Sequence, residues 1–320
     1  MNNLISSTLS HFSLEDLLED IRDHLENNHV LCRYCGSSKI IKFGPRKNIH
    51  GDVQRYWCNS CQKSFTDNKS RYGNQVLSVH DQILDLAVQG VKAEGIKELV
   101  NKKLNCNDNE ETITKQTVLN IIKKDCQFLS TFEYYLCHKN FSSVWEMDET
   151  FEHLIDKQSC YVFNVKAIDT KYWLVSYASL LRNQMAQIIA LTYAYQRAEY
   201  SPEIIRTDGF APKLDNKIPF LKNCKIESIS KKIDYSCINN VERINRSMRD
   251  TIHKRSCVYT IEHLQSLIEL KRIHYNFLQK HPTLANLTPA QIMGIDLPIR
   301  NWIDLLKIAD YFDRNNKIKF

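Results

Sequence analysis

The chain has 320 residues, of which 43% are hydrophobic and 25% charged, and these values are typical of folded proteins of two or three domains. The longest nearly uncharged stretch, 172–196, is interrupted by Arg182, Asn183 and Gln184, which excludes a membrane-spanning helix there. The net charge of +6 is uneven: −5 over 1–30, +6 over 31–70 and +5 over 241–320. Two basic stretches suit a polyanionic partner, although a solvated surface would give the same count.

Two further counts narrow the class of protein. Eleven cysteines, an odd number, and the lack of a basic segment leading into an apolar run near the N-terminus predict a protein of the reducing cytoplasm. Gly90 and Gly95 have the separation of a phosphate-binding loop, but Ile96 stands where that loop needs lysine. We therefore expect no nucleotide cofactor.

Residues 1–30 predict one amphipathic helix. Ser13 begins it, acidic residues follow in the first turn, and apolar side chains recur at helical spacing. The apolar set is Leu14, Leu17, Leu18, Ile21 and Leu25. Its acidic face can cover another domain or be solvated, and we assign it no chemistry.

Residues 31–70 carry two C-x-x-C pairs, separated by 22 residues, that predict a zinc ribbon. The four expected ligands are Cys32, Cys35, Cys58 and Cys61. Residues 39–43 and 53–57 alternate like strands, and Gly44-Pro45 is expected to break the first. Four closed ligands indicate a structural Zn²⁺, and so small a module depends on it to fold. The alternatives are buried free thiols or a redox pair, and we read His50 as an exposed loop residue.

Residues 74–128 predict three helices. Apolar positions recur at helical spacing, and Thr114 can cap the third helix. Lys115, Gln116 and Asn120 would project outward from that helix, as in a recognition helix that enters a DNA major groove. A helix-turn-helix is one interpretation, and any three-helix bundle would give the same pattern.

Residues 140–295 combine strands, helices and three notable carboxylates. The pattern predicts strands over 160–168, 172–178, 203–208 and 225–230, and a long helix beginning at Asn239. Residues 144–151 read as the end of a strand, on which Glu146 and Asp148 share one face while Glu149 points to the other. Asp208 also falls at a strand end, and Glu242 falls in the first turn of the long helix. Each has an ordinary structural explanation, but together they match a two-metal site, which needs hard oxygen ligands on rigid elements.

These residues and their order resemble the DDE transposases of insertion sequences. The likeness rests on Trp145–Thr150, Arg206–Gly209, Asn239–Arg246, Tyr275–Phe277, His281 and Thr288–Gly294, with 34 positions between Asp208 and Glu242. The family implies a multidomain protein with a zinc ribbon, a helix-turn-helix and an α/β RNase H-like core, a mixed five-stranded sheet with helices. Residues 296–320 lie outside the likeness and predict a further amphipathic helix.

The resemblance implies the chemistry as well. Asp148, Asp208 and Glu242 would bind two Mg²⁺ or Mn²⁺ ions and cleave and join DNA strands. Double-stranded DNA, both element ends and target, would be the partner, held at its phosphates by Arg243, Arg246, Arg249, Lys254 and Arg255. Joining two ends implies a homodimer or larger assembly, working at the nucleoid in the cytoplasm. A domesticated regulator without catalysis, or a nuclease without strand transfer, are the alternatives.

Overall fold

The computed structural model describes residues 39–48, 51–66, 74–104, 113–136, 141–154, 158–208, 219–229, 239–254 and 260–316, together with residues 32, 34, 35 and 37. The helix predicted over residues 1–30, His50 and Arg255 lie outside this set. The chain divides into two compact units, residues 1–79 with 296–320, and residues 80–295. Each unit is described by itself.

The first unit contains a three-stranded antiparallel ribbon. Its strands are β1 (Ile40–Asn48), β2 (Gly51–Cys58) and β3 (Ser64–Thr66), in that order across the sheet. The predicted break at Gly44-Pro45 is wrong: β1 continues through it as an irregularity in the register between Lys42 and Pro45. Gly44 takes φ +76°, a conformation that favours glycine, so the chain bulges and then resumes its pairing.

The first unit also contains the helix predicted near the C-terminus. Helix α9 spans Trp302–Asn316, and the Asn301 side chain caps it by accepting a hydrogen bond from the Asp304 amide at 2.9 Å. The apolar side chains that predicted it, Trp302, Leu305, Leu306 and Ile308, are all buried. Its amphipathic pattern is therefore confirmed.

The second unit is built on a mixed five-stranded sheet, as expected. The strands are β4 (Val144–His153), β5 (Ser159–Ala167), β6 (Trp173–Ser179), β7 (Ile204–Asp208) and β8 (Lys225–Ile229), in the order β6-β5-β4-β7-β8. Strands β4, β5 and β6 pair antiparallel, whereas β7 pairs parallel with both β4 and β8. The central strand β4 thus joins the antiparallel and parallel halves of the sheet.

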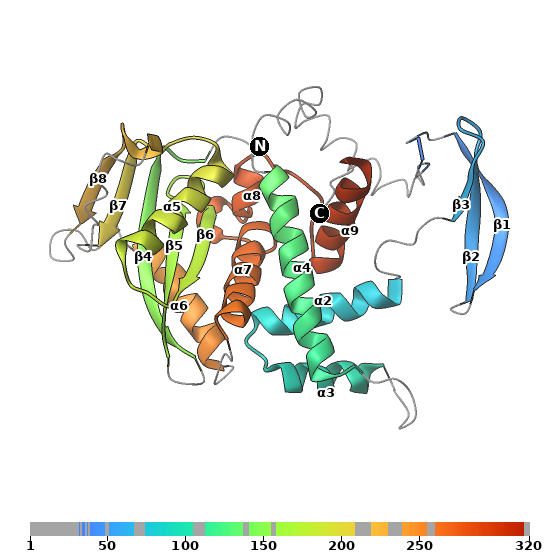
Figure 1. Cartoon of the computed structure of the whole chain (residues 1–320), viewed down its shortest axis with the longest axis horizontal. Helices are drawn as coiled ribbons and strands as arrows, with labels where there is room; N and C mark the ends of the chain where they lie inside the picture. Colours follow the sequence, from blue (N-terminus) through green and yellow to red (C-terminus); the bar gives the residue numbers. More distant parts are fainter. Residues whose placement is uncertain are drawn as a thin grey trace. The chain divides into compact units, whose positions relative to one another are not determined.

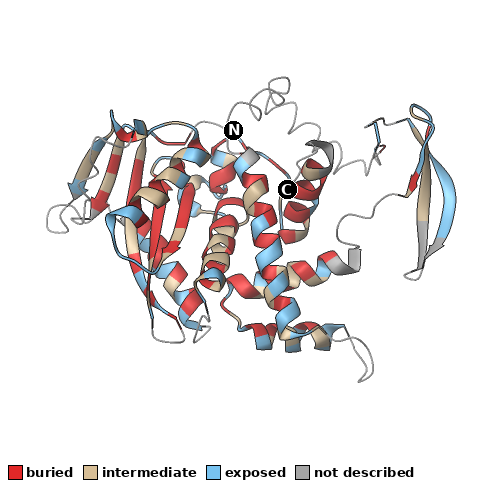
Figure 2. Ribbon diagram, viewed as in Figure 1, coloured by how far each residue is buried: buried red, intermediate tan, exposed pale blue. Residues whose placement is uncertain are grey.

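Helices cover both faces of this sheet (Figure 1). Helix α5 (Gln184–Ala198) packs on one face, while α6 (Asn239–Lys254) and α7 (Ile261–Phe277) pack on the other. Trp173, Ile244, Met248 and Leu264 belong to the core between the sheet and α6 and α7. Figure 2 shows the resulting burial of the inner strands. The 3-10 turns Pro219–Leu221 and Pro282–Leu284 and the short helix α8 (Pro289–Ile292) complete the second unit.

Three helices precede the sheet, at the predicted places. They are α2 (Asn74–Val88), α3 (Ala93–Lys103) and α4 (Lys115–Leu136). Thr114 caps α4, because its hydroxyl accepts a hydrogen bond from the Thr117 amide at 3.1 Å. Helix α4 runs 22 residues, beyond the predicted limit at residue 128. At 1.5 Å per residue it is about 33 Å long, so it reaches from its capped start into the core of the second unit.

The turn between α2 and α3 fits closely against the end of α6. Gly90 in this turn has φ +90°, and a Cβ there would lie 2.8 Å from the Thr251 carbonyl oxygen and 2.9 Å from the Lys254 Cβ. The Thr251 hydroxyl donates a hydrogen bond to the Val88 carbonyl at 3.2 Å. Only glycine fits this position, so the contact between the helical segment and α6 depends on it.

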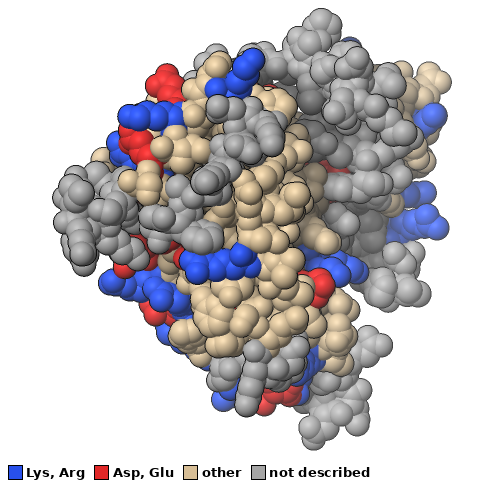
Figure 3. Space-filling model, turned by 60° about the vertical axis from the view of Figure 1, so that its left-hand side comes forward, with Lys and Arg blue, Asp and Glu red and all other residues tan. Residues whose placement is uncertain are grey.

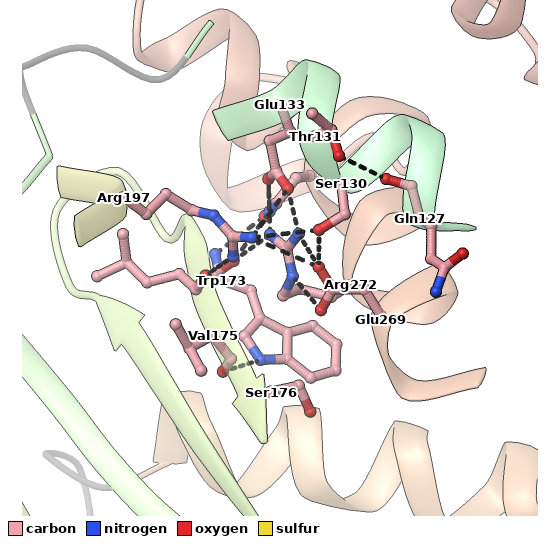
Figure 4. A network of polar contacts seen from close by, with 12 residues as sticks. Gln127, Ser130, Thr131, Glu133, Trp173, Val175, Ser176, Arg197, Glu269 and Arg272 are labelled. Atoms are coloured by element: carbon pink, nitrogen blue, oxygen red, sulfur yellow. Dashed lines mark hydrogen bonds and ion pairs between the residues drawn. The ribbon is translucent and has the colours of Figure 1, made fainter. Parts of the chain in front are cut away.

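A buried charge network anchors the far end of α4 (Figure 4). Glu133 of α4 accepts hydrogen bonds from Arg272 of α7, one of them at 2.6 Å, and from the Tyr172 hydroxyl. Arg272 also bonds Glu269, and Glu269 accepts from Ser130 of α4 at 2.7 Å. Burial alone would raise the pKa of Glu269, but ion pairs with Arg272 and Arg197 and the hydrogen bond from Ser130 hold it at about 2. The buried carboxylates of Glu133 and Glu269 and the guanidinium of Arg272 are thus paired with each other, and any of these charges would be costly to bury alone.

Among the residues that the structure describes, no helix combines the length and the apolar character needed to cross a bilayer.

Candidate active site on the central sheet

The first two predicted carboxylates stand at neighbouring positions of the parallel strand pair β4 and β7. The register pairs Glu146 with Arg206 and Met147 with Thr207, so the next positions along the two strands are Asp148 and Asp208. Neighbouring strands lie about 4.8 Å apart. Asp208 is the last residue of β7, and its side chain lies outside the described part of the structure. Two residues 60 positions apart in sequence are therefore brought side by side along the backbone.

The third carboxylate, Glu242, lies in the first turn of α6 and is exposed. Asn245 follows it by three positions, a spacing that places the two on the same side of a helix. The Asn245 side chain is buried and donates a hydrogen bond to Asp148 Oδ2 at 2.7 Å. Asn245 thus ties α6 to Asp148 at a position three residues after Glu242.

Asp148 is half-buried and held at both carboxylate oxygens. Oδ1 accepts a hydrogen bond from the Glu149 amide at 3.0 Å, and Oδ2 accepts the one from Asn245. Glu149 itself faces the other side of the sheet, where Arg182 donates to it at 2.8 Å. This agrees with the predicted alternation along β4, in which residues 146 and 148 share one face and residue 149 takes the other.

A buried acid and a buried base lie beside Asp148. Glu146 precedes Asp148 by two positions, and it stands opposite Lys166 of β5 in the sheet register. Burial raises the pKa of the Glu146 carboxyl to about 7, against the opposing effect of Lys166 and Arg206. Burial likewise lowers the pKa of Lys166 to about 7, against the effect of Glu146. The face of the sheet under α6 is therefore strongly polar next to the predicted ligand.

Sequence reasoning missed the polar residues that support Asp148. Asn245 carried a usable signal, because it follows Glu242 by three positions on a predicted helix. Glu146 was placed on the face of Asp148 but given no role. Asn164 and Lys166 carried no signal at all, since only the antiparallel register of β4 and β5 brings them beside residues 148 and 146.

The four predicted zinc ligands come together in the ribbon. The Sγ atoms of Cys32, Cys35, Cys58 and Cys61 all lie within 4.8 Å of one another. The Sγ–Sγ distances are 3.5 Å between Cys32 and Cys61 and 3.6 Å between Cys35 and Cys58. Zn–S bonds of about 2.3 Å in a tetrahedron place sulfurs about 3.8 Å apart, so this donor set fits Zn²⁺.

No other group of three or more potential ligands approaches so closely among the described residues. Glu146, Asp148 and Glu242 therefore do not form such a group of three. The third member of the predicted triple, Asp208, is described only in its backbone.

The predicted DNA contacts occupy two helices of the second unit. On α6, Arg243, Arg246 and Lys254 are exposed and Arg249 is half-buried. The opposite side of α6 is apolar, with Val241, Ile244, Met248 and Ile252 buried. On α4, Lys115 is half-buried, Gln116 and Asn120 are exposed, and Gln116 donates to Asn120 at 3.0 Å. Figure 3 shows charged side chains in small groups around a broad uncharged area.

The sequence matches no family model and no curated protein. The structure is similar to the HTLV-2 integrase catalytic core domain in complex with magnesium, at 16% identity and a TM-score of 0.36, over 47% of this chain and 95% of that one. It is also similar to a simian T-cell lymphotropic virus intasome in complex with the PP2A regulatory subunit B56 gamma, at 11% identity and a TM-score of 0.37, over 66% and 74%. Structural similarity at these TM-scores and identities assigns no functional role to any residue of this chain.

Proposed function

We propose that the chain is a DDE transposase of an insertion sequence, a metal-dependent enzyme that cleaves and joins DNA strands. Asp148, Asp208 and Glu242 are the proposed ligands of two Mg²⁺ or Mn²⁺ ions. Two observations support the proposal: the register of β4 and β7, in which Asp148 and Asp208 follow the paired residues Met147 and Thr207, and the hydrogen bond from Asn245 of α6 to Asp148.

The donor chemistry fits the metal. Mg²⁺ prefers carboxylate oxygens, and two-metal sites use ligands on separate rigid elements. Asp148 is held on the central strand by hydrogen bonds at both oxygens, and Glu242 stands in the first turn of a helix whose other side is buried. When bound, the ions would activate a water or a 3′-hydroxyl and stabilise the leaving oxygen.

The chain's own side chains hold the substrate in this proposal. Arg243 and Arg246 are exposed on α6 immediately after Glu242, so phosphates bound there would lie beside the carboxylates. Such contacts supply position and charge but read no sequence. Recognition of the element ends would fall to Lys115, Gln116 and Asn120 on α4 and to the zinc ribbon. Cutting and joining two ends calls for at least a dimer on DNA.

The test is a strand-transfer assay with the purified protein, Mg²⁺ or Mn²⁺, and DNA that carries the sequences flanking the gene. Cleavage with joining is the expected result, and Asp208→Asn should abolish both steps while sparing DNA binding. Lys280→Gln, a change outside the proposed site, is the control and should retain activity. Cleavage without joining would indicate a nuclease, and binding without cleavage would indicate a regulator.

A further inference from the structure

A chain of hydrogen bonds runs across the sheet and ends on Asp148. It begins at Trp173 and Ser176 of β6, passes through Asn164 of β5 and reaches Asn245 of α6. Trp173 Nε1 and Ser176 Oγ donate to Asn164 Oδ1 at 3.2 and 2.7 Å. Asn164 Nδ2 then donates to Asn245 Oδ1 at 2.7 Å, and Asn245 Nδ2 donates to Asp148 Oδ2 at 2.7 Å.

The direction of this chain is fixed at its start. An indole N–H can only donate, and Trp173 Nε1 shares its hydrogen between the Val175 carbonyl at 2.9 Å and Asn164 at 3.2 Å, so the Asn164 atom that faces Trp173 is assigned as the oxygen. The Asn164 nitrogen then faces Asn245, which must present its own oxygen to it. The remaining donor of the Asn245 amide is directed at Asp148. Each amide orientation thus follows from the one before it.

The backbone of Trp173, the first residue in this series of hydrogen bonds, is also held by hydrogen bonds. The Trp173 carbonyl accepts hydrogen bonds from Arg272 at 3.1 Å and Asn276 at 2.9 Å, and its amide donates to Asn276 at 2.9 Å. Trp173, Asn164 and Asn245 are all at least 97% buried. Water therefore cannot substitute readily for any of these partners, and the charge network around Arg272 supports the start of the chain.

We propose that Asn164 and Asn245 form a directional relay in which Trp173 and Ser176 set the amide orientation of Asn245, so that Asn245 orients the carboxylate of Asp148 for a divalent cation. The inference rests on the proposed function, because it assumes that Asp148 is a metal ligand. Asn164 and Asn245 are positioning residues, since they act on the cation only through Asp148. Residues that orient ligands in this way typically affect metal affinity 10–100-fold.

The first test is Mg²⁺ binding to the full chain by isothermal titration. Asn245→Leu removes the donor to Asp148 and should weaken Mg²⁺ binding about 10–100-fold. Thr251→Val is the matched control, because it removes a hydrogen bond from the same helix, that of Thr251 to Val88, at a distance from Asp148. Its Mg²⁺ affinity should equal that of the wild type. Equal affinities for Asn245→Leu and the wild type would overturn the relay.

The second test needs no metal. Asp at position 164 can only accept hydrogen bonds when ionised, so in Asn164→Asp the Asn245 oxygen loses its donor and the Asn245 amide lies between two carboxylates that compete for its N–H groups. The ¹⁵N-labelled side-chain amide signal of Asn245, identified by its loss in Asn245→Leu, should therefore shift in Asn164→Asp and remain in place in Thr251→Val. An unshifted signal in Asn164→Asp would overturn the relay.

The two tests separate the relay from the proposed function. If the wild type binds no Mg²⁺ but the Asn245 amide signal shifts in Asn164→Asp, the metal site is refuted and the direction of the hydrogen bonds stands. A wild type that binds Mg²⁺, with Asn245→Leu binding equally well, would refute the relay alone.

Discussion

The cysteine ribbon and the five-stranded sheet hold their candidate functional side chains in opposite ways. In the ribbon, four sulfurs from two short turns converge within 4.8 Å, and the core beside them is small, with Phe65 as its one fully buried aromatic side chain among the described residues. In the sheet, Asp148 is held by residues up to 97 positions away, over an extensive buried core. We expect the first site to depend on a metal for its fold. The hydrogen bonds that hold Asp148, by contrast, are present in the fold without a metal.

The largest effect expected from this contrast is the loss of the ribbon alone. Cys58→Ser removes one zinc ligand, and without the metal so small a module cannot remain folded. Limited proteolysis should then cut within residues 39–66 while the sheet unit persists. Ser60→Ala, which changes the Ser37–Ser60 hydrogen bond but no ligand, is the control. A ribbon that resists the protease in Cys58→Ser would show that the fold does not need Zn²⁺.

The next effect should fall on the sheet unit alone. Glu133→Ala leaves Arg272 buried with one carboxylate fewer, and breaking a buried ion pair in this way costs about 3–5 kcal/mol of unfolding free energy. Ser130→Ala removes one hydrogen bond of the same network and should cost about 0.5–1.5 kcal/mol. Urea denaturation followed by tryptophan fluorescence measures both. Equal losses for the two variants would contradict the importance assigned to the buried charge.

A smaller loss is expected at the turn between α2 and α3. Gly90→Ala would place a Cβ 2.8 Å from the Thr251 carbonyl at a positive φ, so we expect a loss of about 1–3 kcal/mol. Gly95→Ala, inside α3, meets only the Val91 side chain at 3.3 Å and should change stability by no more than about 1 kcal/mol. Thermal denaturation measures both stabilities. If the two variants proved equally stable, the close fit of the turn against α6 would be refuted.

A pH dependence of similar size is expected in the sheet unit alone. Burial, with Lys271 and His281 nearby, lowers the pKa of His274 to about 4 from 6.5. Between these values the unfolded chain binds a proton that the folded one does not, so the free energy of unfolding should fall as the pH drops from 6.5 to 4. At about 1.4 kcal/mol per pKa unit the fall is about 1–3 kcal/mol. Urea midpoints measured across this range should vary less in His274→Gln, and an unchanged dependence would contradict the assignment.

The two sites also differ in how far sequence could predict them. The cysteine spacing predicted the ribbon's ligands, because both C-x-x-C pairs are local. Strand and helix positions of the sheet were predicted from periodicity, and the structure confirms β5, β6, β7, β8 and α6 at those places. The bulge at Gly44 was misread as a break because glycine and proline signal both. Asn164 could not be found, since its role depends on a register that the sequence does not encode locally.

The proposed function requires that Asp148, Asp208 and Glu242 share divalent cations. The most direct measurement is the number of Mn²⁺ ions bound per chain, followed by electron paramagnetic resonance, in the wild type and in Asp148→Asn, Asp208→Asn and Glu242→Gln. We expect two ions for the wild type and loss of binding in each of the three variants. A wild-type level of Mn²⁺ binding in Asp208→Asn would contradict it.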